Sequence, residues 1–262
     1  MRINKALRKI KRGQPTVGTW LTTGNLQMTR SLARTGFDWL TLDLEHTPFD
    51  WREISALLAC ISDAGCAPLV RVPEGTHTWI KRSLDAGAYG IVVPMVETVE
   101  QAKLAIAAAK YPPVGNRSIG GGMHSLNFDA SNEEYYQSAN HEIMVVLQTE
   151  SPLGIENSAD IYALPGCDAV FVGPNDLRYH MRDAAGNFPS DDEFEKAIQR
   201  IIDTGRNVGT PTGMHVSGST DAIQRISQGM QFVAISSDLR MVLDQASLIV
   251  GALGLAPSKS KS

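Results

Sequence analysis

The chain has 262 residues and a formal net charge of −4. This acidic balance, with no long basic run, argues against nucleic acid and anionic membrane surfaces as partners. No apolar run reaches the length of a membrane span, and the N-terminus lacks the apolar core of a signal peptide, so we expect a cytoplasmic protein.

The composition predicts one folded domain over residues 1–256. Hydrophobic residues make up 43% of the chain, and the 13 prolines and 23 glycines are scattered as turn residues without forming a linker. The polar segment 257–262 (PSKSKS) is predicted to be disordered. The three cysteines, Cys60, Cys66 and Cys167, are odd in number and lack metal-site spacing, which indicates reduced thiols.

In chain order, the sequence predicts a first amphipathic helix and then apolar strands that alternate with helices. The first helix spans Lys5 to Arg12. The predicted strands are Thr16 to Leu21, Trp39 to Leu44, Ala67 to Val72, Gly90 to Val93, Ile143 to Leu147, Ala169 to Val172, Val208 to Met214 and Phe232 to Ile235. The predicted helices are Asn25 to Thr35, Asp50 to Ala64, His77 to Ala86, Thr98 to Lys110, one begun by Pro152, Asp192 to Thr204, Ser219 to Gln228 and Asp238 to Leu253.

Eight apolar strands alternating with helices predict an α/β fold of the (β/α)₈ or TIM barrel type, with an additional N-terminal helix. A doubly wound open sheet is the competing architecture. It usually carries a glycine fingerprint between its first strand and helix, and the segment Trp20 to Asn25 is not one. The glycines Gly120 to Gly122 lie in a long Gly-, Ser- and Asn-rich excursion, Val114 to Asn140, with no strand before them. The barrel is therefore the better prediction.

Two carboxylates follow neighbouring predicted strands. Glu150 comes just after the fifth strand, near Gln148, and Asp176 follows the sixth strand in the segment Gly173-Pro174-Asn175-Asp176. The carboxyl ends of parallel strands are where ligands bind in barrels. Because no lysine or arginine lies in either motif, the pair would hold a hard divalent cation better than the two charges would tolerate each other. The alternative is that both carboxylates cap helices or pair with distant arginines.

Further polar residues follow the second and third predicted strands. Asp43, Glu45 and His46 end the second strand, and Arg71 ends the third. Arg71 stays protonated and would hold an oxyanion or carboxylate, unless it simply pairs with Asp43. His46 is the natural acid/base candidate because its unperturbed pKa lies near neutrality, although a lone histidine in a polar loop is more often merely exposed to solvent.

The lysines bear on the mechanism of a possible aldolase. A Schiff-base aldolase needs a desolvated lysine, typically on a strand of the barrel. Lys81, Lys103, Lys110 and Lys196 fall on predicted helices, and no predicted strand carries a lysine. An enolate formed here would therefore depend on the metal and on Arg71 for stabilisation.

Seven motifs resemble, in order, those of a known family, and the resemblance covers the chain from Val17 to Asp244. They are GFDWLTLDLEH (Gly36 to His46), PLVRVP (Pro68 to Pro73), IKRSLDAGAYGIVVPMVET (Ile80 to Thr98), AAKYPPVGNRSIGG (Ala108 to Gly121), QTE (Gln148 to Glu150), PGCDAVFVGPNDL (Pro165 to Leu177) and FVAISSDL (Phe232 to Leu239). The chain is thus similar to the HpcH/HpaI family of metal-dependent pyruvate aldolases, which includes 4-hydroxy-2-oxoheptanedioate and 2-dehydro-3-deoxyglucarate aldolases. Macrophomate synthase is a relative of that family.

The resemblance implies a metal site and a substrate site. Glu150 and Asp176 match the family's metal ligands, which bind Mg²⁺ or, alternatively, Mn²⁺ or Co²⁺, and Gln148 matches a polar residue near the metal. The segment Gly173-Pro174-Asn175 matches the one whose backbone N–H groups receive the pyruvate carboxylate in the family.

The resemblance also implies the catalytic residues. Arg71 would face the keto oxygen of pyruvate and stabilise its enolate, and Asp43 matches an acidic residue of the same site. His46 would assist proton transfer at the substrate hydroxyl in partnership with Asp85, which a second subunit could supply. Family members are homo-oligomers, hexamers or trimers, commonly with an exchanged last helix.

Two segments depart from the family pattern. They are Ser118 to Asn140, with His124, Asn127 and Phe128, and the segment from Arg178 to Arg182. Both are expected near the mouth of the barrel, where they would leave pyruvate chemistry intact and alter the choice of the aldehyde.

Three functions follow from these observations. The first is a class II aldolase that reversibly cleaves a 4-hydroxy-2-oxo acid to pyruvate and an aldehyde through a metal-stabilised enolate. The second is oxaloacetate decarboxylation, or capture of the same enolate as in macrophomate synthase. The third is a non-catalytic oligomeric barrel, which the presence of all the matched residues disfavours.

Overall fold

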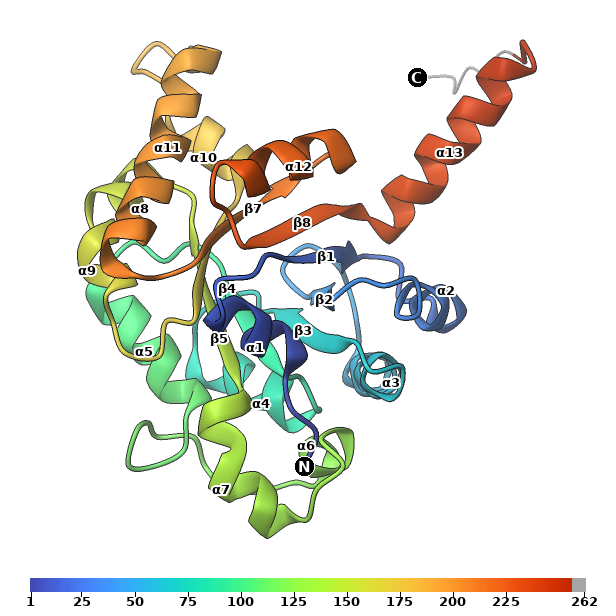
Figure 1. The fold of residues 1–262 in the computed structure, drawn as a ribbon, viewed down its shortest axis with the longest axis vertical. Helices are drawn as coiled ribbons and strands as arrows, with labels where there is room; N and C mark the ends of the chain where they lie inside the picture. Colours follow the sequence, from blue (N-terminus) through green and yellow to red (C-terminus); the bar gives the residue numbers. More distant parts are fainter. Residues whose placement is uncertain (256–262) are drawn as a thin grey trace.

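A computed structural model describes residues 1–255 of the chain, so the tail 257–262 predicted to be disordered lies outside the described residues. Eight parallel strands close into a barrel in which each strand pairs with the next in sequence and β8 returns to β1. Helices surround this barrel (Figure 1). The (β/α)₈ fold predicted from the sequence is confirmed, and the open sheet is excluded.

The strands and helices have the following bounds. The strands are β1 (Thr16–Leu21), β2 (Trp39–Asp43), β3 (Ala67–Arg71), β4 (Gly90–Val93), β5 (Met144–Thr149), β6 (Ala169–Val172), β7 (Thr212–Val216) and β8 (Phe232–Ser237). The helices are α1 (Lys5–Lys11), α2 (Leu26–Leu32), α3 (Trp51–Asp63), α4 (His77–Asp85), α5 (Val99–Ala109), α6 (Met123–Asn127), α7 (Asn132–Glu142), α8 (Pro152–Glu156), α9 (Ser158–Tyr162), α10 (Pro174–His180), α11 (Asp191–Val208), α12 (Ser219–Ser227) and α13 (Asp238–Ala252). Among the described residues, none of these helices is long and apolar enough to span a membrane.

Side-chain caps fix where several helices begin. Asp50 accepts hydrogen bonds from the backbone N–H groups of Arg52 and Glu53, and the Glu53 carboxylate accepts from the Asp50 N–H in return. This capping box satisfies donors that the first helical turn of α3 leaves free. The helix predicted from Asp50 to Ala64 is therefore confirmed, with Asp50 as its N-cap.

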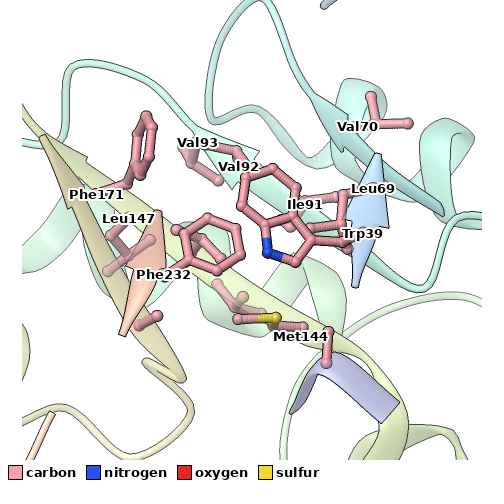
Figure 2. Packing of buried hydrophobic residues seen from close by; sticks show 14 of the residues in the cluster. Trp39, Leu69, Val70, Ile91, Val92, Val93, Met144, Leu147, Phe171 and Phe232 are labelled. Atoms are coloured by element: carbon pink, nitrogen blue, oxygen red, sulfur yellow. The ribbon is translucent and has the colours of Figure 1, made fainter. Parts of the chain in front are cut away.

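The inside of the barrel is filled with large side chains. The Trp39 indole of β2 stacks on the Phe232 ring of β8, with the ring centroids 4.2 Å apart (Figure 2). A Cβ atom at Gly18 of β1 would lie 2.2 Å from that indole, so only glycine leaves it room. Packed side chains thus fill the interior of the barrel, and ligands can bind only at one of its ends.

The seventh strand was predicted at the wrong place. It begins at Thr212 and reaches Val216, whereas Val208, predicted as its first residue, is the last residue of α11. Helix α11 continues because its buried residues recur at helical spacing through Gly205, and it ends at Gly209, which adopts the left-handed conformation with φ of 81°. The correction moves His215 into the strand.

The excursion from Val114 to Asn140 contains two helices, α6 and α7. Its placement near the mouth was a wrong prediction for this chain. The Phe128 carbonyl accepts a hydrogen bond from the Arg2 N–H, and the Asn127 amide donates to the Gly87 carbonyl just before β4. The segment therefore packs at the amino end of the barrel.

Helix α13 projects away from the barrel (Figure 1). Only Asp238 of this helix is buried, and Leu243, Leu248 and Ile249 are each at least half exposed. A helix that packs on another subunit would carry such an apolar surface. Its exchange between subunits stays a prediction.

Candidate active site

A cavity of about 170 Å³ opens at the carboxyl end of the barrel. A larger cavity, of about 550 Å³, lies at the amino end against the first residues of the chain. We assign the site to the smaller cavity because the residues of several strand ends converge there. Its lining residues are Trp20, His46, Arg71, Gln148, Phe171, Gly173, Pro174, Asn175, Asp176 and His215.

Arg71 is held by two carboxylates. Its Nε and Nη2 atoms lie 2.9 and 2.7 Å from the Asp43 carboxylate oxygens, and its Nη1 lies 2.9 Å from Oε2 of Glu45. The two contacts with Asp43 are hydrogen bonds and the contact with Glu45 is an ion pair, so part of the five guanidinium N–H donors stays available to a ligand. The pairing of Arg71 with Asp43 that the sequence left open is therefore present, and it orients the guanidinium without exhausting its donors.

Glu150 is a buried carboxylate at the end of β5. Its Oε1 accepts a hydrogen bond of 2.7 Å from the Met95 N–H, and its Oε2 accepts one of 2.7 Å from the Gln148 amide. Burial raises the pKa of Glu150 to about 7, against the lowering effect of the Met95 N–H, and the negative charges of Asp176 and Glu45 raise it further. Too little positive charge therefore lies beside Glu150 to favour its ionised form over the protonated one.

The wall opposite Glu150 has no space for a side chain. A Cβ atom at Gly173, just after β6, would lie 2.0 Å from Oε2 of Glu150, so any other residue there would have to displace this carboxylate. Beside it, Oε1 of Gln148 is buried and has no hydrogen-bonding partner among residues 1–255. A buried acceptor without a donor is costly unless a ligand or ion completes it.

These features suit a divalent cation. Within residues 1–255, no group of three or more His, Cys, Asp and Glu side chains is placed to hold a metal ion. The predicted ligands Glu150 and Asp176, together with the free Oε1 of Gln148, nevertheless present oxygen atoms and surplus negative charge. Hard cations such as Mg²⁺ take that kind of donor and complete their shells with water and substrate oxygens.

His46 lies at the rim of the cavity. Its side chain is 62% exposed, and its Nε2 lies 3.7 Å from Oε2 of Glu45. Burial is the main cause that raises the pKa of Glu45, opposed by the charges of Arg71 and His46. Within this chain, the carboxylate beside the His46 ring is therefore that of Glu45, a residue for which we predicted no separate role from the sequence.

Asp85 lies elsewhere in the same chain. It ends helix α4 five residues before β4 begins, which places it at the amino end of the barrel. There its Oδ1 pairs with Nη2 of Arg117 at 2.8 Å, and the Arg117 side chain is fully buried. The structure thus does not join Asp85 to His46 within one subunit, and a partnership between subunits stays a prediction.

Sequence reasoning missed three side chains of the cavity wall: Trp20, Phe171 and His215. Trp20 meets Phe171 edge to face at 5.6 Å, stacks on the His215 ring at 6.3 Å, and lies 5.1 Å below the Arg71 guanidinium carbon. The position of His215, directly after the predicted seventh strand Val208 to Met214, could have indicated it as a residue of the mouth.

The segment from Arg178 to Arg182 lies where it was predicted. It continues α10 beside the mouth, and Nδ1 of His180 lies 2.9 Å from the backbone oxygen of Glu150. Because a carbonyl only accepts, this nitrogen donates, and the contact anchors α10 to the end of β5.

Comparison with known proteins identifies relatives along nearly the whole chain. The model of the HpcH/HpaI aldolase/citrate lyase family matches residues 16–245. The chain is 34% identical to 2-dehydro-3,6-dideoxy-6-sulfogluconate aldolase of Pseudomonas putida, over 93% of this chain and 94% of that protein. It is 37% identical to 5-keto-4-deoxy-D-glucarate aldolase of Klebsiella pneumoniae, over 90% of this chain and 91% of that protein.

Solved structures agree with these matches. A HpcH/HpaI aldolase/citrate lyase family protein from Burkholderia cenocepacia superimposes with a TM-score of 0.87 and 30% identity, over 95% of this chain and 99% of the other. Macrophomate synthase superimposes with a TM-score of 0.79 and 25% identity, over 96% and 91% of the two chains. The resemblance inferred from the seven motifs is confirmed.

Proposed function

The chain belongs to the HpcH/HpaI aldolase/citrate lyase family, and we propose that it is a divalent-metal-dependent aldolase. The reaction is the reversible cleavage of a 4-hydroxy-2-oxo acid to pyruvate and an aldehyde through the enolate of pyruvate. Two curated relatives are aldolases, which supports a lyase activity. We infer the metal dependence and the pyruvate product from the residues of the site.

One observation carries the proposal: the mouth has more negative than positive charge. Four carboxylates lie around it, those of Asp43, Glu45, Glu150 and Asp176. Arg71 is the one permanently charged cation that acts on both Glu45 and Glu150. A surplus of carboxylates, one of them buried with a pKa of about 7, is unfavourable unless a cation binds.

Glu150 and Asp176 would hold this cation, with Oε1 of Gln148 close by. When bound, it would supply Lewis-acid charge where the enolate oxygen develops. Arg71 would direct its remaining N–H groups at the same oxygen, held in place by Asp43 and Glu45. None of the eight strands carries a lysine, so a Schiff base on a strand is not available to do this work.

The substrate carboxylate and the proton need separate groups. Gly173 and Asn175 offer backbone N–H groups at the cavity wall, whereas Pro174 has none. His46 would take the proton of the C4 hydroxyl. The C3–C4 bond then breaks, its electron pair forms the enolate, the aldehyde leaves, and a proton returned to C3 gives pyruvate.

The test is deuterium exchange into the pyruvate methyl group, with and without added Mg²⁺ or Mn²⁺ and after chelation. Exchange that requires the metal would support the proposal without knowledge of the aldehyde. Exchange that survives chelation, or a covalent pyruvate adduct trapped by borohydride, would overturn the metal-dependent mechanism. A screen of aldehydes then defines the second substrate.

A further inference from the structure

His215 is a residue of the mouth for which the proposed steps have no use. It lies on β7, lines the cavity together with Arg71 and Gly173, and is partly buried. Burial lowers its pKa, and the positive charge of Arg71 lowers it further, although the Ser236 contact and Asp43 act in the opposite direction. The ring is therefore neutral and is poorly suited to take up a proton.

A backbone contact fixes the tautomer of this ring. Nε2 of His215 lies 2.9 Å from the carbonyl oxygen of Ser236. A carbonyl can only accept, so Nε2 carries the hydrogen and Nδ1 carries the lone pair. Ser236 has a φ of 55°, an uncommon conformation for a residue other than glycine, at the point where the register between β1 and β8 shifts. Such strain persists only where its surroundings impose it.

The plane of the ring is also fixed. The indole of Trp20 lies parallel to it within 7°, and Trp20 is itself held by Phe171 edge to face. Nδ1 makes no hydrogen bond to residues 1–255. It is also not one of the buried side-chain atoms that lack a partner in this part of the chain, so it is accessible. It therefore remains an oriented acceptor on the cavity wall.

The chemistry of this acceptor decides what it can bind. A neutral nitrogen lone pair repels carboxylate and keto oxygens, which have only lone pairs to offer, and it attracts a hydroxyl hydrogen. The carboxylate and keto group of pyruvate are served by the N–H donors of Arg71, Gly173 and Asn175. The donors left on a 4-hydroxy-2-oxo acid are its C4 hydroxyl, assigned to His46, and any hydroxyl on the aldehyde fragment.

We propose that Nδ1 of His215 accepts a hydrogen bond from a hydroxyl of the aldehyde fragment, so that the enzyme selects hydroxyaldehydes over plain alkyl aldehydes. This inference rests on the proposed aldolase function and adds the class of its second substrate. A site built to bond a hydroxyl discriminates against the analogue that lacks it, because its own polar atom is then left unpaired. His215 is thus a specificity residue, and His46 remains the base.

The test compares aldol addition of pyruvate to two matched aldehyde pairs, glycolaldehyde with acetaldehyde and glyceraldehyde with propionaldehyde. We expect His215→Leu to lower kcat/KM roughly 10–100-fold for the hydroxylated member of each pair and to leave the alkyl member almost unchanged. His215→Gln should retain part of the preference, because its amide N–H can reach the Ser236 carbonyl while its oxygen replaces Nδ1 as the acceptor.

The controls separate the possible failures. Deuterium exchange into pyruvate without an aldehyde is measured in wild type and in His215→Leu, and any loss of exchange in the variant is divided out of its rates with the aldehydes. If wild type shows no exchange, the proposed aldolase function fails. If exchange is normal but His215→Leu lowers both members of each pair equally, or wild type has no preference for the hydroxylated aldehydes, the assignment of His215 is overturned.

Discussion

Two buried glutamates flank β5 and meet opposite environments. Glu142 precedes the strand at the amino end of the barrel, and Glu150 follows it at the carboxyl end, with 5% and 3% of their surfaces exposed. Glu142 pairs with the Arg8 guanidinium and accepts a hydrogen bond of 2.8 Å from the Asn4 N–H. Glu150 accepts from a backbone N–H and an amide, both neutral, and faces the charges of Asp176 and Glu45.

The same difference holds for the two ends of the barrel. At the amino end, acidic groups have basic partners within the chain, as in the pairs of Lys9 with Asp38 at 2.8 Å and Arg117 with Asp85 at 2.8 Å. At the mouth, several carboxylates share Arg71. A charge neutralised inside the chain stabilises the fold, whereas a charge left without compensation is available to a ligand. The comparison predicts which buried acids are structural and which bind a ligand.

The largest expected effect is on activity at Glu150. Glu150→Gln keeps the shape of the side chain and removes the charge that holds the cation, so we expect pyruvate deuterium exchange to fall roughly 10³–10⁵-fold, the several kcal/mol that a bound metal supplies. Glu142→Gln, the same substitution at the other end, is the matched control and should keep its exchange rate. Full exchange in Glu150→Gln after chelation and return of Mg²⁺ would remove Glu150 from the metal site.

A smaller loss is expected at His46, and only for one reaction. His46→Ala should slow aldol cleavage roughly 10²–10⁴-fold, because it removes the positioned base for the C4 hydroxyl. Decarboxylation of oxaloacetate has no hydroxyl to deprotonate and should fall much less. Both rates are to be measured with the same metal and pH. An equal loss in both reactions would show that His46 orders the site and does not act as the C4 base.

The pKa of Glu150 predicts how the stability of the metal-free protein depends on pH. Its folded-state pKa of about 7 lies above the ordinary value of 4.5, so between these pH values the folded state holds a proton that the unfolded state has lost. The free energy of unfolding should therefore fall as pH rises through this window, by on the order of 3 kcal/mol. Urea denaturation in the presence of a chelator measures this fall.

The glutamine variant of Glu150 isolates that contribution. Glu150→Gln has no carboxyl to titrate, so the difference in unfolding free energy between wild type and variant should change between pH 4.5 and 7. Other groups titrate in both proteins and cancel in the difference. Added Mg²⁺ should stabilise wild type more at pH 8 than at pH 5, because the ligand must be ionised. A constant difference across this range would contradict the raised pKa.

The smallest expected effect is on stability at Glu142. Glu142→Gln can still accept from the Asn4 N–H but loses its charge pair with Arg8, so the free energy of unfolding should fall by about 1.5 kcal/mol. Thermal and urea denaturation measure this loss, and exchange activity per folded molecule serves as the control. If Glu142→Gln lost activity without losing stability, the division between a structural and a functional end of the barrel would not hold.

The sequence by itself determined the fold and most of the residues that line the candidate site. Eight apolar segments at regular spacing can bury themselves only as strands covered by helices, and this pattern predicted the closed barrel. Ligands bind at the carboxyl ends of the strands in such barrels. Because all parallel strands end on the same side, this predicted that Arg71, Gln148 and Asp176 lie at one cavity, as they do. These inferences depend on the spacing of apolar residues and on the direction of the chain, and both can be read from the sequence.

Tertiary structure alone decided which charged groups meet. No local pattern indicates that Arg71 bonds both Asp43 and Glu45, that Glu45 is the acid beside His46, or that Asp85 pairs with Arg117 at the other end of the barrel. The role of His215 was hidden for the same reason, since its tautomer depends on a carbonyl 21 positions away, at Ser236. Such contacts join different strands and helices, and the distance between their atoms is set by the packing of the whole barrel.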